Sequence, residues 1–196
     1  MIVLRAMLAR RRAWLAALLA GALLAGCATP QRIAGRADAS AFDRTGRFAV
    51  TVEQRNGKHD AVQGGFAWRD TDRRLVLDLA NPLGNTLARV EVGAGRAVLT
   101  RSNGSTETAG SPDELVEQAL GSPIPVAGLR DWLRGRLGGS PAQGLQQDAQ
   151  GRPERFQQSG WRVSLSRYDD RGPRLLQLRR SDYDRDISVR LAVDGP

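Results

Sequence analysis

Alternation of apolar and polar residues dominates the chain from about Gly46 to Val193, and a period of two is typical of β-strands with one buried face. Asn56-Gly57 and Asn103-Gly104 separate such runs and favour hairpin turns. The first half therefore predicts a β-meander, and strands resume near the C-terminus. The apolar positions that define the strands are Phe48, Val50, Val52, Val62, Gly64, Phe66, Trp68, Leu75, Leu77, Leu79, Ala88, Val90, Val92, Val98, Trp161, Val163, Leu165, Leu175, Leu178, Ile187, Val189, Leu191 and Val193.

Helical spacing replaces the alternation between these two groups of strands. Ser111-Pro112-Asp113-Glu114 has the form of a capping box with proline at the first helical position. Gly121 follows the apolar stripe and predicts the end of this helix. The stripe consists of Leu115, Val116, Ala119 and Leu120.

A second short helix is predicted after Pro123-Ile124-Pro125, with Gly135 as its stop. Its apolar face consists of Leu129, Trp132 and Leu133. Periodicity alone favours packing of this face on the sheet. The polar, glycine-containing stretch from Gly138 to Gly151 predicts a connection, with one short strand near Leu145.

The N-terminal residues have the pattern of a bacterial lipoprotein signal. Arginines 5, 10, 11 and 12 precede an apolar run, Ala13 to Ala25, that is too short to span a bilayer as a mature helix. Leu24-Ala25-Gly26-Cys27 then places the only cysteine directly after small residues. We expect removal of residues 1–26, acylation of Cys27 and a flexible tether over residues 27–45, followed by a single domain over residues 46–194. A buried structural cysteine beside an ordinary secretory cleavage site is the alternative.

Acyl anchoring would hold the mature protein on a membrane without crossing it, since two or more chains bind stably at about 0.8 kcal/mol per CH₂. Ala28, rather than an aspartate, follows the cysteine, which resembles the outer-membrane address of bacterial sorting. The predicted location is therefore the outer membrane, lipid-anchored and facing the periplasm.

Charge changes this interpretation little. The formal net charge is +8, and removal of residues 1–26 takes away four arginines and no acidic residue, which leaves +4. Lys58 is the only lysine, so the basic composition is typical of GC-rich coding rather than of selected nucleic-acid contacts. We expect no nucleic-acid partner, and a mild positive surface suits anionic head groups or an acidic protein. With one cysteine, the domain must be stabilised by a hydrophobic core.

Catalytic chemistry is not indicated. His59, the only histidine, follows Asn56-Gly57 in a polar stretch, and no nucleophile, phosphate-loop or metal-ligand motif is present in the sequence. The carboxylates Asp169, Asp170, Asp182, Asp184 and Asp186 are interleaved with Arg171 and Arg185. This mixture favours solvated loop charge over a calcium site or acid–base chemistry. We therefore expect no enzyme, no metal and no cofactor.

Leu83 stands in Asn81-Pro82-Leu83-Gly84, a strong turn between two predicted strands, and turn chemistry leaves an outward and a folded-back side chain equally open. This segment, together with residues 122–135 after a lipobox, closely resembles the LolB family of outer-membrane lipoproteins. Weaker agreement extends over Gly46 to Val193 and includes Gly46-Arg47-Phe48, Gly65-Phe66-Ala67-Trp68 and Ser159-Gly160-Trp161.

The resemblance implies a mainly β fold with short helices: an incomplete antiparallel β-barrel wrapped around a helical lid, enclosing an apolar cavity. It implies a monomeric receptor that accepts triacylated lipoproteins from a LolA-like periplasmic carrier and inserts them among the phospholipids of the outer membrane's inner leaflet. Leu83 would project toward solvent and act in insertion. Candidate cavity residues are Phe66, Trp68, Leu77, Val90 and Trp161, and the lid candidates are Ile124, Leu129, Trp132 and Leu133.

Two other classes stay open. An envelope scaffold would bind peptidoglycan or another protein through polar loops, with a filled core and no affinity for acyl chains. A hydrolase would require a nucleophile and base that the sequence does not reveal, and loss of activity on changing His59 would indicate one.

Overall fold

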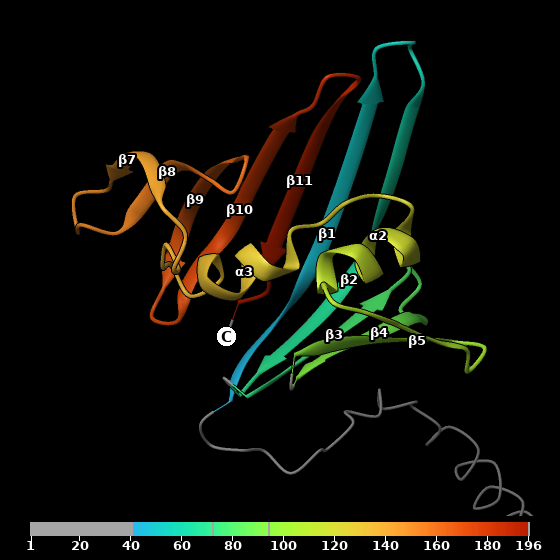
Figure 1. Ribbon diagram of the computed structural model, residues 1–196. Coiled ribbons are helices and arrows are strands. Elements are labelled where there is room, and N and C mark those ends of the chain that lie inside the picture. The colour runs from blue at the N-terminus through green and yellow to red at the C-terminus, as the bar shows by residue number, and fades with distance from the viewer. Residues whose placement is uncertain (1–40, 72, 94, 196) are drawn as a thin grey trace, which may run out of the picture. The chain divides into compact units, whose positions relative to one another are not determined.

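One antiparallel sheet forms most of the computed structural model, which describes residues 41–71, 73–93 and 95–195 (Figure 1). Its eleven strands have the order β6-β5-β4-β3-β2-β1-β11-β10-β9-β8-β7. The N-terminal meander and the C-terminal strands therefore join where β1 pairs with β11. The strands are β1 (Phe42–Gln54), β2 (His59–Asp70), β3 (Arg74–Ala80), β4 (Thr86–Gly93), β5 (Arg96–Arg101), β6 (Thr106–Ala109), β7 (Ala142–Gln147), β8 (Pro153–Gln158), β9 (Trp161–Asp169), β10 (Gly172–Ser181) and β11 (Arg185–Val193).

Alternating burial along the strands follows from the period-two pattern. On β1, Phe48, Val50 and Val52 are buried while the residues between them are more exposed. Glycine lies opposite an aromatic residue at the centre of the β1–β2 pair, where Gly46 faces Phe66 and Gly64 faces Phe48. A Cβ atom at position 46 would lie 2.9 Å from the Phe66 ring, so glycine makes room for the ring in the curved sheet.

Two helices lie across one face of the sheet in the described part of the chain (Figure 1). Helix α2 (Pro112–Leu120) packs on β4, β5 and β6 and begins as predicted, with Pro112 at N1 and Ser111 as N-cap. The Ser111 hydroxyl accepts a hydrogen bond from the backbone N–H of Asp113 at 3.2 Å, while Glu114 is exposed. Gly121 ends the helix with φ of 68°. Helix α3 (Val126–Trp132) follows directly and packs beside α2.

The apolar faces of the sheet and of both helices form one continuous core. It includes Leu115 and Val116 of α2 and Leu129 and Trp132 of α3, all at most 2% exposed. Burial of each such side chain is worth about 1.5–3 kcal/mol, so the core stabilises a domain that has no disulfide available to it. The described residues belong to a single compact unit.

The fold class is as predicted: mainly β, with short helices inside an incomplete antiparallel barrel. Strands β6 and β7 end the sheet at opposite edges, and the described residues show no pairing between them. The predicted signal peptide, Cys27 and most of the predicted tether lie outside the described residues.

Some boundaries differ from the prediction. Strand β1 begins at Phe42, four positions before Gly46. The apolar pattern misses these positions because the buried residue among them is an arginine, Arg44. Strands β6 and β8 carry too few apolar residues for the pattern to reveal them. Strand β7 lies in the polar stretch where a short strand near Leu145 is expected.

Candidate functional site

A rigid turn holds Leu83 at the tip of the β3–β4 hairpin. The side-chain oxygen of Asn81 accepts hydrogen bonds from the backbone N–H groups of Leu83 and Asn85, both at 3.0 Å. The N–H of Gly84 donates to the carbonyl of Asn81 at 2.9 Å, and the φ of +87° at Gly84 favours glycine. The Leu83 side chain is 86% exposed, so it takes the outward of the two orientations that turn chemistry allows.

Leu87 is a second exposed apolar residue close to this turn, and the sequence pattern does not single it out. Ala80 pairs with Thr86 while Leu79 pairs with Ala88, so Leu87 is the extra residue of a β-bulge. A bulge redirects a side chain, and Leu87 is 38% exposed although it lies on a strand. The hairpin therefore presents two leucines to solvent.

The predicted cavity and lid residues lie in the apolar interior. Trp68, Leu77 and Val90 occupy neighbouring strands in one row, since Trp68 pairs with Leu77 and Leu77 with Val90. The nine predicted residues are each at most 5% exposed, so their side chains fill the interior in this structure. They are Phe66, Trp68, Leu77, Val90, Ile124, Leu129, Trp132, Leu133 and Trp161.

The Trp132 ring is fitted closely into α3. A Cβ atom at Gly128, one turn earlier, would lie 2.6–2.9 Å from three atoms of this ring, so glycine is required for the ring to fold back along its own helix. The indole N–H of Trp132 donates to the side-chain oxygen of Gln158 on β8 at 2.7 Å. The Trp132 and Phe156 rings meet edge to face, with 6.1 Å between their centroids. The helix and the C-terminal strands are thereby linked.

Ion pairs attach α3 to β2, in the N-terminal part of the sheet. Asp70, at the end of β2, has no exposed surface and accepts two hydrogen bonds from Arg130, at 2.9 and 2.7 Å. Arg134 donates to the same carboxylate at 2.6 Å. We call Asp70, Arg130 and Arg134 the α3 tie. Sequence reasoning does not find it, because the partners are 60 and 64 positions apart.

Asp113 of α2 supports the start of α3. Pro125 occupies the N-cap position of α3 and makes no side-chain capping bond, but a carboxylate oxygen of Asp113 accepts from the backbone N–H of Ala127 at 2.9 Å. Burial raises the pKa of Asp113, and the N–H groups of Ala127 and Val126 oppose that rise. The two helices therefore form one hydrogen-bonded cover.

A second, partly buried ion pair lies next to the α3 tie. Two terminal nitrogens of Arg44 donate to the two carboxylate oxygens of Asp169, each at 2.7 Å. These hydrogen bonds lower the pKa of Asp169 to about 2. The Phe42 ring packs against the guanidinium groups of Arg134 at 4.3 Å and of Arg44 at 5.5 Å. This contact holds the first residues of β1 in place, so the strand starts before Gly46, at Phe42.

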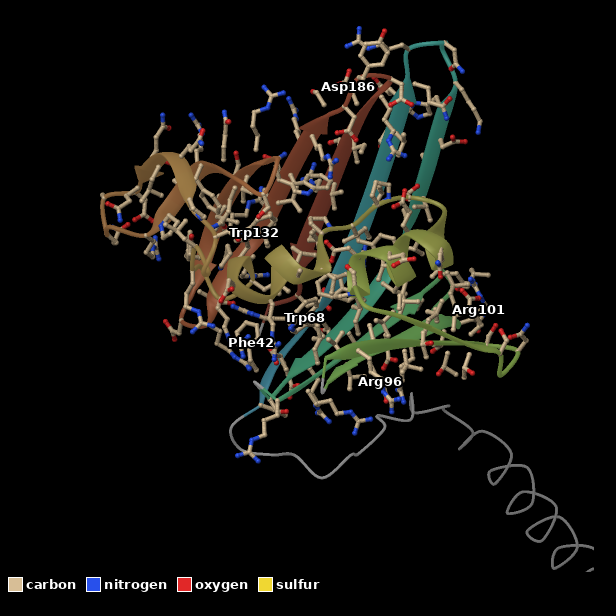
Figure 2. All side chains as sticks on the ribbon, viewed as in Figure 1. Phe42, Trp68, Arg96, Arg101, Trp132 and Asp186 are labelled. Atoms are coloured by element: carbon tan, nitrogen blue, oxygen red, sulfur yellow. The ribbon has the colours of Figure 1, made fainter. Side chains whose placement is uncertain are left out.

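Two buried donors in this region have no acceptor among the described residues: Nε of Arg44 and the indole Nε1 of Trp68. The two residues are directly paired across β1 and β2. Figure 2 shows Trp68 on the sheet below α3, near Phe42.

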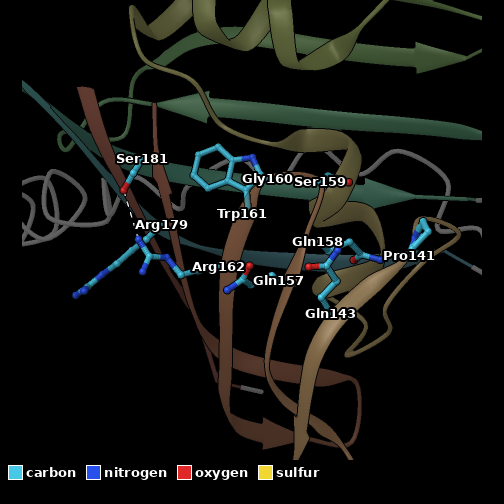
Figure 3. Close-up of a pocket in the computed structure, with 10 residues that line it drawn as sticks. All are labelled: Pro141, Gln143, Gln157, Gln158, Ser159, Gly160, Trp161, Arg162, Arg179 and Ser181. Atoms are coloured by element: carbon cyan, nitrogen blue, oxygen red, sulfur yellow. Dashed lines mark hydrogen bonds between the residues drawn. The ribbon is translucent and has the colours of Figure 1, made fainter. Parts of the chain in front are cut away.

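A surface hollow of about 420 Å³ lies at the turn between β8 and β9 and is lined by both polar and apolar groups (Figure 3). Gln143, Gln157, Arg162 and Arg179 contribute to it, and the buried Trp161 forms part of one wall. This hollow is not the apolar space that the sequence predicts around Trp161.

In the carboxylate-rich segment around Asp182, the structure shows ion pairs with arginine. Asp182 pairs with Arg180 at 2.8 Å and with Arg185 at 3.6 Å, and His59 is solvent-exposed, 3.9 Å from Glu53. Within the described ranges, no group of three or more His, Cys, Asp or Glu residues is arranged to hold a metal. Among these residues no helix has the length and apolar character needed to cross a membrane.

Comparison with known proteins extends these observations. Residues 40–195 match the family described as outer membrane lipoprotein LolB. The chain is 58% identical to the outer-membrane lipoprotein LolB of Bordetella petrii over 189 residues, covering 95% of this chain and 94% of the relative. It is 38% identical to that of Cupriavidus metallidurans over 200 residues, covering 96% and 98%. A crystal structure of a LolA superfamily protein from Nitrosomonas europaea is similar, with a TM-score of 0.42 and 8% identity, over 79% of this chain and 87% of that protein.

The fold and the site define an open antiparallel β-barrel protein with an apolar interior under a helical cover and an exposed leucine at a hairpin tip. More particularly, the chain belongs to the outer-membrane lipoprotein LolB family, because the family match and the relatives span most of its length. It is an outer-membrane lipoprotein of lipoprotein localisation, as the resemblance implied.

Proposed function

We propose that this protein accepts triacylated lipoproteins from a LolA-like periplasmic carrier and inserts them among the phospholipids of the inner leaflet of the outer membrane. Transfer is passive and passes through the apolar interior. Acylation of Cys27 holds the protein at the membrane, and residues between Cys27 and β1 act as a tether. The protein works as a monomer, without a metal or cofactor.

The exposed Leu83 carries this proposal. A leucine that is 86% exposed gains nothing from the protein core, yet the Asn81 side chain and Gly84 hold its backbone in one conformation. Transfer of such a side chain into lipid is favourable by about 1.5–3 kcal/mol. The bulged Leu87 enlarges the apolar surface of the hairpin. We infer that this hairpin enters the leaflet and disturbs it where cargo is released.

The interior suits acyl chains in its chemistry. Its sheet wall is aliphatic and aromatic, and its cover, α3, is held at identifiable points: the α3 tie, the Trp132–Gln158 hydrogen bond and the Asp113 contact. Side chains fill this space in the structure, so acyl chains enter by displacing α3 from the sheet. Asp70 belongs to β2 and Gln158 to β8, so loss of either contact would leave α3 held by the other.

Transfer needs no fuel if affinity rises along the route. At about 0.8 kcal/mol per CH₂, three long acyl chains in water cost tens of kcal/mol, so they must be shielded throughout. A receptor that binds the chains more tightly than the carrier, and a bilayer that binds them more tightly still, make each step downhill.

Transfer from a loaded carrier tests the proposal. The chain from Ala28 to Pro196, without Cys27, is mixed with carrier loaded with a triacylated lipoprotein, and the cargo is followed by pull-down. We expect cargo to move to this protein. No transfer to a folded, monomeric sample would overturn the proposal and favour the envelope scaffold.

Leu83→Glu separates uptake from delivery. Leu83 is exposed and is not part of the buried core, so uptake from the carrier should be unchanged, while transfer from the loaded variant to phospholipid vesicles should fail. Leu145→Glu is the matched control, because Leu145 is 42% exposed on the edge strand β7 and should tolerate the same charge with both steps intact. Equal loss of uptake and delivery in Leu83→Glu would contradict the role of the tip.

A further inference from the structure

Arg44 and Trp68 are paired across β1 and β2, and each carries a buried donor without an acceptor among the described residues. Arg44 Nε and Trp68 Nε1 are the buried side-chain nitrogens that find no acceptor in residues 41–71, 73–93 and 95–195. The residues are 5% and 2% exposed. Buried N–H groups are nearly always hydrogen-bonded, because an unpaired donor loses its water without compensation. Two such donors on adjacent positions indicate a site for an acceptor from outside the chain.

The backbone register brings the two residues together. Arg44 on β1 lies directly opposite Trp68 on β2, and opposite residues of an antiparallel pair have Cβ atoms about 4.5–5.5 Å apart. Both side chains are on the buried face, where Trp68 also neighbours Leu77. The donors therefore lie at the margin of the apolar interior, beside the α3 tie.

The ion pair with Asp169 fixes the orientation of Arg44. Two terminal nitrogens of Arg44 are engaged by the carboxylate at 2.7 Å each, which holds the planar guanidinium group and hence the direction of its Nε–H bond. The same pairing offsets the charge of Arg44. The donor pair is therefore better suited to a neutral oxygen than to an anion.

We propose that Arg44 and Trp68 bind the carbonyl oxygen of an acyl group whose hydrocarbon chain lies in the apolar interior. A carbonyl oxygen has two lone pairs and can accept from both N–H groups at once. This inference rests on the proposed function and adds to it the part of the cargo that is recognised: the ester or amide carbonyl of the acylated cysteine. A pocket of this kind is mostly apolar, with a small number of polar groups that fix the orientation of its ligand.

Two matched probes test the carbonyl contact. One is a synthetic triacylated cysteine peptide, and the other is a trialkyl analogue in which each carbonyl is replaced by CH₂. The chain from Ala28 to Pro196 is used, because the described residues form one compact unit with its own core. We expect wild type to favour the acyl probe roughly fivefold, which corresponds to about 1 kcal/mol for a net hydrogen bond.

Trp68→Phe removes the indole N–H and keeps an aromatic ring. The acyl-to-alkyl preference should fall toward one, while any change in packing affects both probes alike. Trp161→Phe is the matched control, since it also removes an indole on the buried face but not one of the unsatisfied donors, and it should keep the preference. An unchanged preference in Trp68→Phe would overturn the proposal.

The indole resonance of wild type provides a test that does not depend on folding of Trp68→Phe. The Trp68 N–H signal is assigned by elimination with Trp132→Phe and Trp161→Phe, and it should move downfield with the acyl probe but not with the alkyl probe. Binding of both probes with no such shift would overturn the carbonyl site and leave the proposed function intact. Failure to bind either probe would instead contradict the proposed function. Palmitate is the third probe, and a larger shift with its carboxylate would overturn the assignment to an acyl ester or amide.

Discussion

Removal of the charge of Asp70 is expected to destabilise the protein strongly. Its carboxylate has no exposed surface and accepts three hydrogen bonds of 2.6–2.9 Å from Arg130 and Arg134. Asp70→Asn preserves the shape but removes the buried negative charge to which both guanidinium groups donate, and Arg134 is only 13% exposed. Loss of one partner from a buried ion pair costs about 3–5 kcal/mol. For a domain of this size, the melting temperature should fall by roughly 2–4 °C for each of these kcal/mol.

Urea unfolding, followed by tryptophan fluorescence and circular dichroism, measures this loss. Asp43→Asn is the matched control. Asp43 accepts from Arg69 at 2.9 and 3.3 Å, but the two side chains are 43% and 41% exposed, so this surface pair should contribute less than about 1 kcal/mol. If Asp70→Asn and Asp43→Asn lowered the free energy of unfolding equally, the reasoning that the α3 tie anchors the helical cover would be refuted.

Three further outcomes follow from individual contacts. The Arg44 hydrogen bonds lower the pKa of Asp169 to about 2. The charged carboxylate therefore stabilises the fold fully at pH values above its ordinary pKa of 3.8, and this stabilisation is lost as pH falls toward 2. Asp169→Asn should flatten the dependence of stability on pH across this window in acid titrations. Gly128→Ala should lower the free energy of unfolding by about 1–3 kcal/mol in urea titrations, because its Cβ would overlap the Trp132 ring. Burial raises the pKa of Tyr168 to about 12, so phenolate absorbance should show one tyrosine still protonated well above the ordinary value of 10.0.

Local patterns predicted much of the sheet because burial on one face imposes a period of two. Phe48, Val50 and Val52 are buried as the alternation requires. Strand β8 escaped detection because Gln158 takes an inward position that an apolar residue would normally fill. Its oxygen accepts from Trp132 and its amide donates to the carbonyl of Ser140 at 2.5 Å, so a polar side chain is satisfied inside the core.

The site was predictable in part, for a similar reason. The proline–glycine turn around Leu83 is a local signal, although the side-chain direction depends on hydrogen bonds that only the folded hairpin makes. The α3 tie joins residues more than fifty positions apart, and Arg44 meets Asp169 across 125 positions. Charges at such separations find their partners through topology, which no local pattern contains.

The unpaired edges of the sheet have a mechanical consequence. In a closed barrel, a change of circumference must break backbone hydrogen bonds or shift the register of every strand. Among the residues that the structure describes, β6 and β7 end the sheet separately, and β7 is irregular in its pairing with β8. The width of the open barrel can therefore change through the twist and curvature of the sheet, without loss of strand pairing. Because the sheet is not closed, its interior has no fixed volume. We therefore expect one fold to accommodate acyl groups of different length.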